Sequence, residues 1–138
     1  MSYSNYPELK QAFQALHGWQ QRYRELMLLG KSLPVLANEL KVDEAKVSGC
    51  ESNVWLYIDF TPQEDKLVVV ADSDTRIVKG LLALILMMYN GKTPQQAAAL
   101  DAEQEFEELG LMRHLSPSRG NGIRAIVSAI NQFAKSHC

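Results

Sequence analysis

The segment of residues 77–89 is the feature that most constrains how this chain can fold. Drawn as a helix, it carries apolar side chains in nearly every direction, so other elements must enclose it on most sides. Its apolar run falls far short of the roughly 20 residues that span a bilayer. Asp72 and Asp74 offer capping oxygens and negative charge at its start. We therefore predict a core helix that runs through Asn90.

Two strand-like runs precede this helix. Residues 53–60 alternate between apolar and polar side chains, and residues 66–71 are rich in valine, with a polar turn between the two runs. A short third strand over residues 45–48 would complete a small antiparallel sheet. One face of such a sheet must be covered by helices.

Helical spacing of apolar residues predicts several further helices, and Gly30 is expected to cap the second of them. The predicted ranges are 8–16, 19–29, 93–100, 101–109 and a final helix that opens at Ser116 and Pro117. A length of 138 residues suits one domain. We therefore expect a single α+β domain over residues 1–138, in which a three-stranded antiparallel sheet packs against several helices.

Charge and cysteine content exclude several functions. The chain carries 14 Lys and Arg against 16 Asp and Glu, so we expect no nucleic-acid or membrane partner recruited by a basic field. No secretory signal is visible, and two cysteines make no disulfide framework, which favours the cytoplasm. The dispersed histidines His17, His114 and His137 predict no metal site.

Cys50 lies in a turn-like stretch between strand-like runs, where Gly49 frees the backbone and polar residues follow. A lone cysteine is more often a small buried hydrophobe than a reactive group. Several interpretations therefore remain open, among them a non-catalytic adaptor with a packed cysteine and a thiol-dependent redox protein. The redox protein would need a second thiol near Cys50, and Cys138 is expected to be a solvated tail residue without a role.

Arg119 is the second residue that stands out. A cation in the first turn of a helix opposes the helix dipole, so Arg119 is locally misplaced, although a solvated arginine remains an alternative. Gly120 and Gly122 cost about 1 kcal/mol each in a helix interior unless they permit close backbone approach. Their position beside Arg119 supports a site there.

Four pieces of the chain, in this order, resemble the SufE family of sulfur-acceptor proteins. They are residues 49–55 (GCESNVW), 71–74 (ADSD), 77–81 (IVKGL) and 115–119 (LSPSR). The chain resembles the CsdE branch more closely. That likeness is carried by Tyr23 and Arg24 and by residues 28–31 (LLGK), 90–93 (NGKT) and 108–111 (ELGL).

This resemblance implies a function and partners. In SufE-like proteins the cysteine that matches Cys50 receives sulfane sulfur from a cysteine desulfurase and carries it as a persulfide. The implied partner is a SufS-like or CsdA-like desulfurase, which is stimulated and which holds the PLP, so we expect no cofactor on this chain. The sulfur would pass to a downstream acceptor or scaffold for Fe–S cluster assembly. The implied fold is shared with IscU-type scaffolds, and whether the chain forms a homodimer stays open.

The resemblance also implies the residues of the site. Arg119 is expected beside the cysteine loop, where it would interact with the persulfide, and Asp74 is expected nearby. Gly49 and Glu51 flank Cys50, and Glu51 would hinder formation of the reactive thiolate if its carboxylate pointed at the sulfur. Glu51 also departs from the glutamine found in SufE proper.

Overall fold

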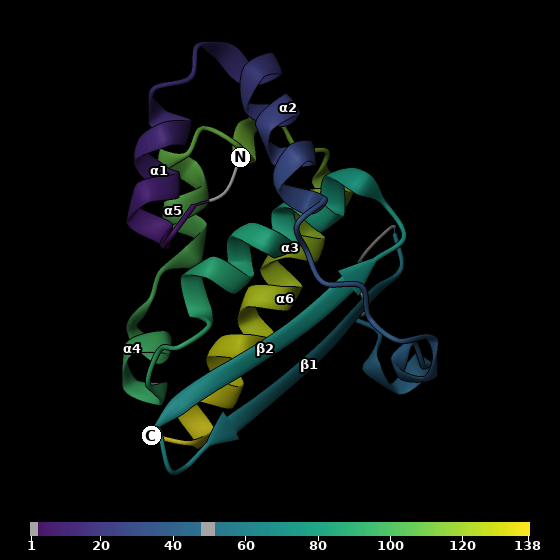
Figure 1. Ribbon diagram of the computed structural model, residues 1–138, viewed down its shortest axis with the longest axis vertical. Helices are drawn as coiled ribbons and strands as arrows, with labels where there is room; N and C mark the ends of the chain where they lie inside the picture. The colour runs from purple at the N-terminus through teal and green to yellow at the C-terminus, as the bar shows by residue number, and fades with distance from the viewer. Residues whose placement is uncertain (1–2, 48–51) are drawn as a thin grey trace.

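The computed structural model describes residues 3–47 and 52–138, and its centre is the helix α3 (Arg76–Tyr89) (Figure 1). This helix contacts α1 (Tyr6–Gln14), α2 (Gly18–Gly30), β2 (Lys66–Ser73) and α6 (Pro117–Ser136). Most of its side chains are buried, including Leu81, Leu82, Leu84 and Ile85. The predicted enclosed core helix is therefore confirmed.

The sheet of the described residues is an antiparallel ribbon of β1 (Val54–Thr61) and β2. Its register pairs Val54 with Ser73 and Thr61 with Lys66. The predicted third strand is wrong for its described part, because the chain makes a 3₁₀ turn, η2 (Asp43–Ala45), and then a single bridge between Lys46 and Trp55. Asp43 and Glu44 favour the turn, and one bridge does not continue into a strand.

The loop after α3 follows the outer edge of β2. The backbone of Leu67 exchanges hydrogen bonds with this loop, donating to the carbonyl of Lys92 (2.8 Å) and accepting from the amide of Gly91 (3.2 Å). The side chain of Asn90 binds both backbone groups of Val69, at 2.6 and 3.0 Å. Gly91 makes the required turn with a φ of 82°, which favours glycine.

Two glycines bring α2 and α3 together. A Cβ on Gly30 would lie 2.8 Å from the backbone nitrogen of Gly80, and a Cβ on Gly80 would overlap the carbonyl oxygen of Leu26. The predicted cap at Gly30 is therefore wrong, since Gly30 lies in the last turn of α2 and Lys31 is the C-cap. Glycine is needed here for close helix packing.

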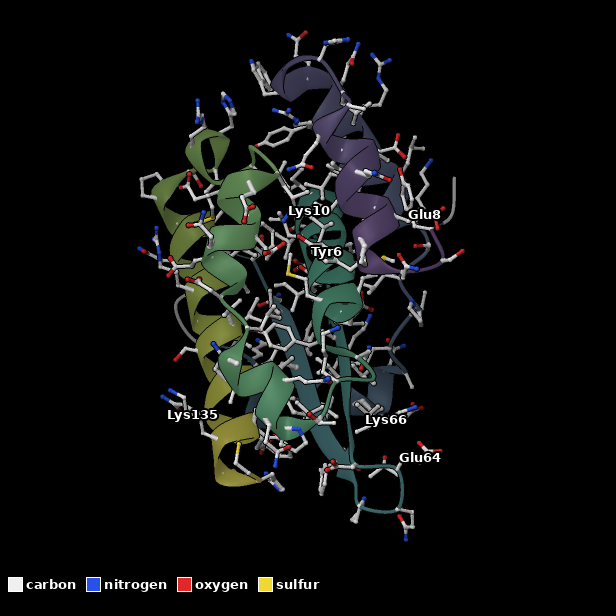
Figure 2. All side chains as sticks on the ribbon, turned by 90° about the vertical axis from the view of Figure 1, so that its left-hand side faces the viewer. Tyr6, Glu8, Lys10, Glu64, Lys66 and Lys135 are labelled. Carbon is white, nitrogen blue, oxygen red and sulfur yellow. The ribbon has the colours of Figure 1, made fainter. Side chains whose placement is uncertain are left out.

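Helices α4 (Pro94–Ala99) and α5 (Ala102–Glu108) lie close to their predicted ranges. Two short 3₁₀ helices that were not predicted are η1 (Asn38–Leu40) and η3 (Met112–His114). Figure 2 shows Tyr6 and Lys10 of α1, whose side chains reach Glu105 of α5 at 2.8 and 3.0 Å. Figure 1 shows α6 behind the ribbon, on the side of α3. Within the described part of the chain, no helix has the length and apolar character to cross a membrane.

Candidate functional site

The segment that joins β2 to α3 holds the chain just after Cys50. Asn53 Nδ2 donates to Asp74 Oδ2 over 2.9 Å, and Ser73 Oγ donates to the carbonyl of Asn53 over 2.7 Å. The hydroxyls of Thr75 and Ser52 are hydrogen-bonded at 2.8 Å. We call Ser73, Asp74 and Thr75 the clamp. The clamp fixes the position of Ser52 and Asn53 at the start of β1.

The predicted caps of α3 are wrong. Asp72 lies inside β2, and the N-cap is Thr75, whose side chain makes no capping hydrogen bond. Asp74 accepts hydrogen bonds from the side chains of Asn53 and Thr75 instead. Both carboxylates are thus used to connect separate parts of the chain.

Asp72 is a buried carboxylate that connects β2 to the segment before η2 and to α3, a role that was not predicted. Its side chain is 1% exposed and accepts hydrogen bonds from the backbone amides of Leu36 (3.1 Å) and Ser73 (2.8 Å). Lys41 Nζ and Lys79 Nζ lie 3.6 and 3.7 Å from its oxygens. Trp55 is the sequence feature that could have indicated this buried carboxylate. It pairs with Asp72 across the ribbon and is buried, although it lies on the face of β1 expected to be polar.

A small apolar cavity adjoins Ser52. It is lined by β1, α3 and the first turns of α6, through Ser52, Val54, Val78, Leu81, Ser118, Arg119, Gly122, Ile123 and Ile126. Its free volume of about 20 Å³ has room for about one water-sized group. Ser116 caps α6 by accepting from the amide of Arg119 over 3.2 Å, which sets where Arg119 leaves the helix.

The guanidinium of Arg119 has an unsatisfied donor at this cavity. Its Nε is buried and has no hydrogen-bond partner within residues 3–47 and 52–138. The charge of Arg119 also acts on Tyr23: burial raises the pKa of the phenol, and the positive charge of Arg119 opposes that rise. The hydroxyl of Tyr23 donates to the carbonyl of His114, and the ring of His114 stacks on Trp19 with centroids 5.7 Å apart.

The two glycines beside Arg119 differ in their surroundings. Gly122 lines the cavity. A Cβ on Gly120 would meet only a flexible atom of the Arg124 side chain, at 3.6 Å, among the described residues. No backbone of the described residues therefore requires glycine at position 120 by close approach.

Three of the predicted site residues, Gly49, Cys50 and Glu51, lie outside the described residues. The structure brings the other two, Arg119 and Asp74, to the chain that follows Cys50: Arg119 shares the cavity with Ser52, and Asp74 binds Asn53. Cys138 is exposed, and its thiol donates to the carbonyl of Ala134 over 3.3 Å.

Comparisons with known proteins agree with this arrangement of elements. A solution structure of a hypothetical protein from Thermus thermophilus matches with a TM-score of 0.77, covering 99% of this chain and 98% of that one. The two chains share 15% sequence identity, so this likeness concerns the fold alone.

Sequence relatives give a closer comparison. The sulfur acceptor protein CsdE of Escherichia coli is 42% identical over 123 residues, which cover 88% of this chain and 82% of that protein. An uncharacterised SufE-like protein of Rhizobium etli is 43% identical over 125 residues, or 89% of this chain and 84% of the relative. The SufE family model, described as an Fe-S metabolism associated domain, matches residues 7–134. From this match over most of its length, the chain belongs to the SufE family.

Proposed function

We propose that this protein accepts and carries sulfur for iron–sulfur metabolism, with Cys50 as the carrier residue. Two findings support the proposal: the family domain is associated with Fe-S metabolism, and the CsdE relative is a sulfur acceptor. The sulfur donor is the persulfide of a PLP-dependent cysteine desulfurase. The PLP stays on that enzyme.

The observation that carries the proposal is the buried Nε of Arg119, which has no hydrogen-bond partner among the described residues and belongs to a side chain that lines the same cavity as Ser52. Consecutive Cα atoms are about 3.8 Å apart, so chain connectivity keeps the Cα of Cys50 within about 7.6 Å of that of Ser52. An anionic persulfide on Cys50 is within reach of this cavity and would accept a charge-assisted hydrogen bond from Arg119. The cavity has room for about one small group, which suits one added sulfur atom.

The transfer step needs no outside oxidant or reductant. The thiolate of Cys50 attacks the outer sulfur of the desulfurase persulfide. A new S–S bond forms on Cys50, and the S–S bond on the desulfurase breaks. The desulfurase thiolate leaves with the electron pair and is ready for another turnover, which accounts for stimulation of that enzyme. A second attack of the same kind, by a thiolate of the downstream acceptor, unloads Cys50.

The direct test is mass spectrometry of the protein after incubation with a cysteine desulfurase and cysteine. We expect one added sulfur atom on Cys50, with no adduct on the Cys50→Ser variant and a normal adduct on Cys138→Ser. Cys138→Ser is the matched control because it removes the other thiol of the chain. Absence of any adduct on Cys50 with every desulfurase tested would refute the proposal and favour the adaptor. A disulfide between Cys50 and another thiol in place of the persulfide would favour a redox protein.

A further inference from the structure

A groove of about 480 Å³ lies between the second half of α2, the chain after it and the first turn of α3. Its walls include Met27, Leu28 and Val35, which are 41%, 43% and 79% exposed. Single exposed apolar residues are ordinary, but several in one place mark an interaction surface. The groove therefore has the apolar component of a protein-binding site.

Positive charge surrounds the same groove. The cationic residues that line it are Arg24, Lys31, Arg76 and Lys79, against the single carboxylate of Asp74. Lys79 is paired with Asp72, whereas Arg24, Lys31 and Arg76 form no ion pair within the described ranges. The whole chain has a formal charge of −2, so this excess of positive charge is a local feature.

The groove is adjacent to the proposed sulfur-carrying segment. Asp74 lines the groove and also accepts the hydrogen bond of Asn53, three residues after Cys50. A protein seated in the groove therefore lies beside the clamp. Among the described residues, the groove and the cavity that Arg119 lines share no lining residue.

We propose that this groove docks an acidic segment of the cysteine desulfurase that also carries apolar side chains, an inference that rests on the function proposed above. The carboxylates of that segment face Arg24, Lys31 and Arg76, and its apolar side chains cover Met27, Leu28 and Val35. Complementary charge of this kind speeds encounter and fixes orientation. Docking at the groove orients the Cys50 segment toward the persulfide of the desulfurase.

A second copy of this chain fits the groove less well. The densest run of acidic side chains lies on α5, which Figure 1 places beside α1, away from the start of α3. Contact between α5 of one copy and the groove of another would close into a symmetric dimer only if the reciprocal contact formed as well. Glu105 of α5 is also already bound by Tyr6 and Lys10.

The experiment measures the affinity of the protein without sulfur on Cys50 for the desulfurase that loads wild-type Cys50. The affinity is measured over a range of salt concentrations. Arg24→Glu/Lys31→Glu should weaken binding about tenfold or more and flatten the salt dependence, because it reverses two charges at the groove. Val35→Ser should weaken binding with the salt dependence unchanged. The matched control is Lys66→Glu/Lys135→Glu, the same charge change at the end of the molecule away from α2, where Figure 2 labels both lysines. The control should bind within about twofold of wild type.

A second readout identifies the partner groups. A carbodiimide that joins amines to carboxylates without a spacer should link Lys31 to an Asp or Glu of the desulfurase, and should leave Lys66 and Lys135 unlinked. The groove proposal is overturned if the groove and control variants bind alike while wild-type Cys50 is loaded with sulfur. It is also overturned if the groove variant loads normally and fails only in passing sulfur on, since the groove would then serve the downstream acceptor. Failure of wild-type Cys50 to load is a different result, because it removes the proposed function and the docking proposal together.

Discussion

The side-chain amide of Asn53 donates to the carboxylate of Asp74 over 2.9 Å, and so ties the chain after Cys50 to the segment that begins α3. This hydrogen bond is solvent-exposed and contributes on the order of 1 kcal/mol at most to stability. Its main effect is to hold Ser52 and Asn53 in place. The clamp can therefore be tested separately from the stability of the fold.

Asp74→Ala should slow sulfur loading of Cys50 by about tenfold at saturating desulfurase, because the rate of a reaction falls steeply when the reacting groups are misplaced. Asp74→Asn keeps an oxygen that can accept from Asn53 and should stay close to wild type. The measurement is the rate of persulfide formation, with thermal unfolding recorded in parallel. Equal rates for alanine, asparagine and wild type would show that the clamp does not position Cys50.

Arg119→Ala should lower the persulfide yield on Cys50 by about tenfold, since a charge-assisted hydrogen bond contributes roughly 1.5–3 kcal/mol. Arg119→Lys should restore part of the yield, because lysine supplies the charge without the planar group of donors. The unfolding midpoint should stay near that of wild type in both. If yield and midpoint fall together, Arg119 has a structural role; if neither changes, Arg119 does not bind the persulfide.

Asp72→Ala should reduce the free energy of unfolding by about 2–4 kcal/mol. The substitution leaves the buried amides of Leu36 and Ser73 without an acceptor, and leaves Lys41 and Lys79 without their carboxylate. Urea denaturation measures the change. A loss below about 0.5 kcal/mol would show that water replaces the carboxylate at little cost.

Regular patterns in the sequence predicted most of the fold. The apolar residues of α3 and the alternation in β1 are local signals, and both elements form where those signals lie. The incorrect predictions concern residues at which segments distant in the sequence come into contact. Gly30 has the sequence signature of a cap, but it is required by contact with Gly80, fifty residues away, which no local pattern contains.

The candidate site could be predicted only in part. The position of Arg119 in the first turn of a helix marked it as unusual, and it lies at the cavity beside Ser52. Asp72 and Asp74 have the spacing of helix caps, and the sequence alone does not reveal that Leu36, Lys41 and Asn53 approach them. Such cross-chain contacts depend on tertiary packing.

Gly80→Ala should destabilise the protein by about 2 kcal/mol or more, because the added methyl group would overlap the backbone of Leu26 and force α2 from α3. Gly120→Ala is the matched control: it also adds a methyl group to a buried helical glycine, but among the described residues this group meets only the Arg124 side chain, at 3.6 Å. The control should be neutral or stabilising by up to about 1 kcal/mol. Thermal or urea unfolding of both variants gives the comparison, and equal losses would contradict the close packing of α2 on α3.

Alkaline pH should destabilise the protein through Tyr89. Burial raises the pKa of this phenol from 10.0 to about 12, against the opposing effect of its hydrogen bond with Asn131. A phenol whose pKa is higher in the folded state contributes stability that is fully present below pH 10 and is lost as the pH rises toward 12. Tyr89→Phe should therefore flatten the decline in the free energy of unfolding over this interval. An identical decline in the variant would assign it to other groups, such as Tyr3, whose pKa burial and Glu25 also raise to about 12.

The loop that follows α3 has a consequence for self-association. Unpaired backbone groups along the border of a sheet are a template on which another chain can add a strand, and this leads to aggregation. Asn90, Gly91 and Lys92 occupy those groups at Val69 and Leu67, so this part of the β2 edge is closed to strand addition by the protein's own chain. A partner that extends the ribbon at this end must therefore approach along β1, the strand that Cys50 precedes.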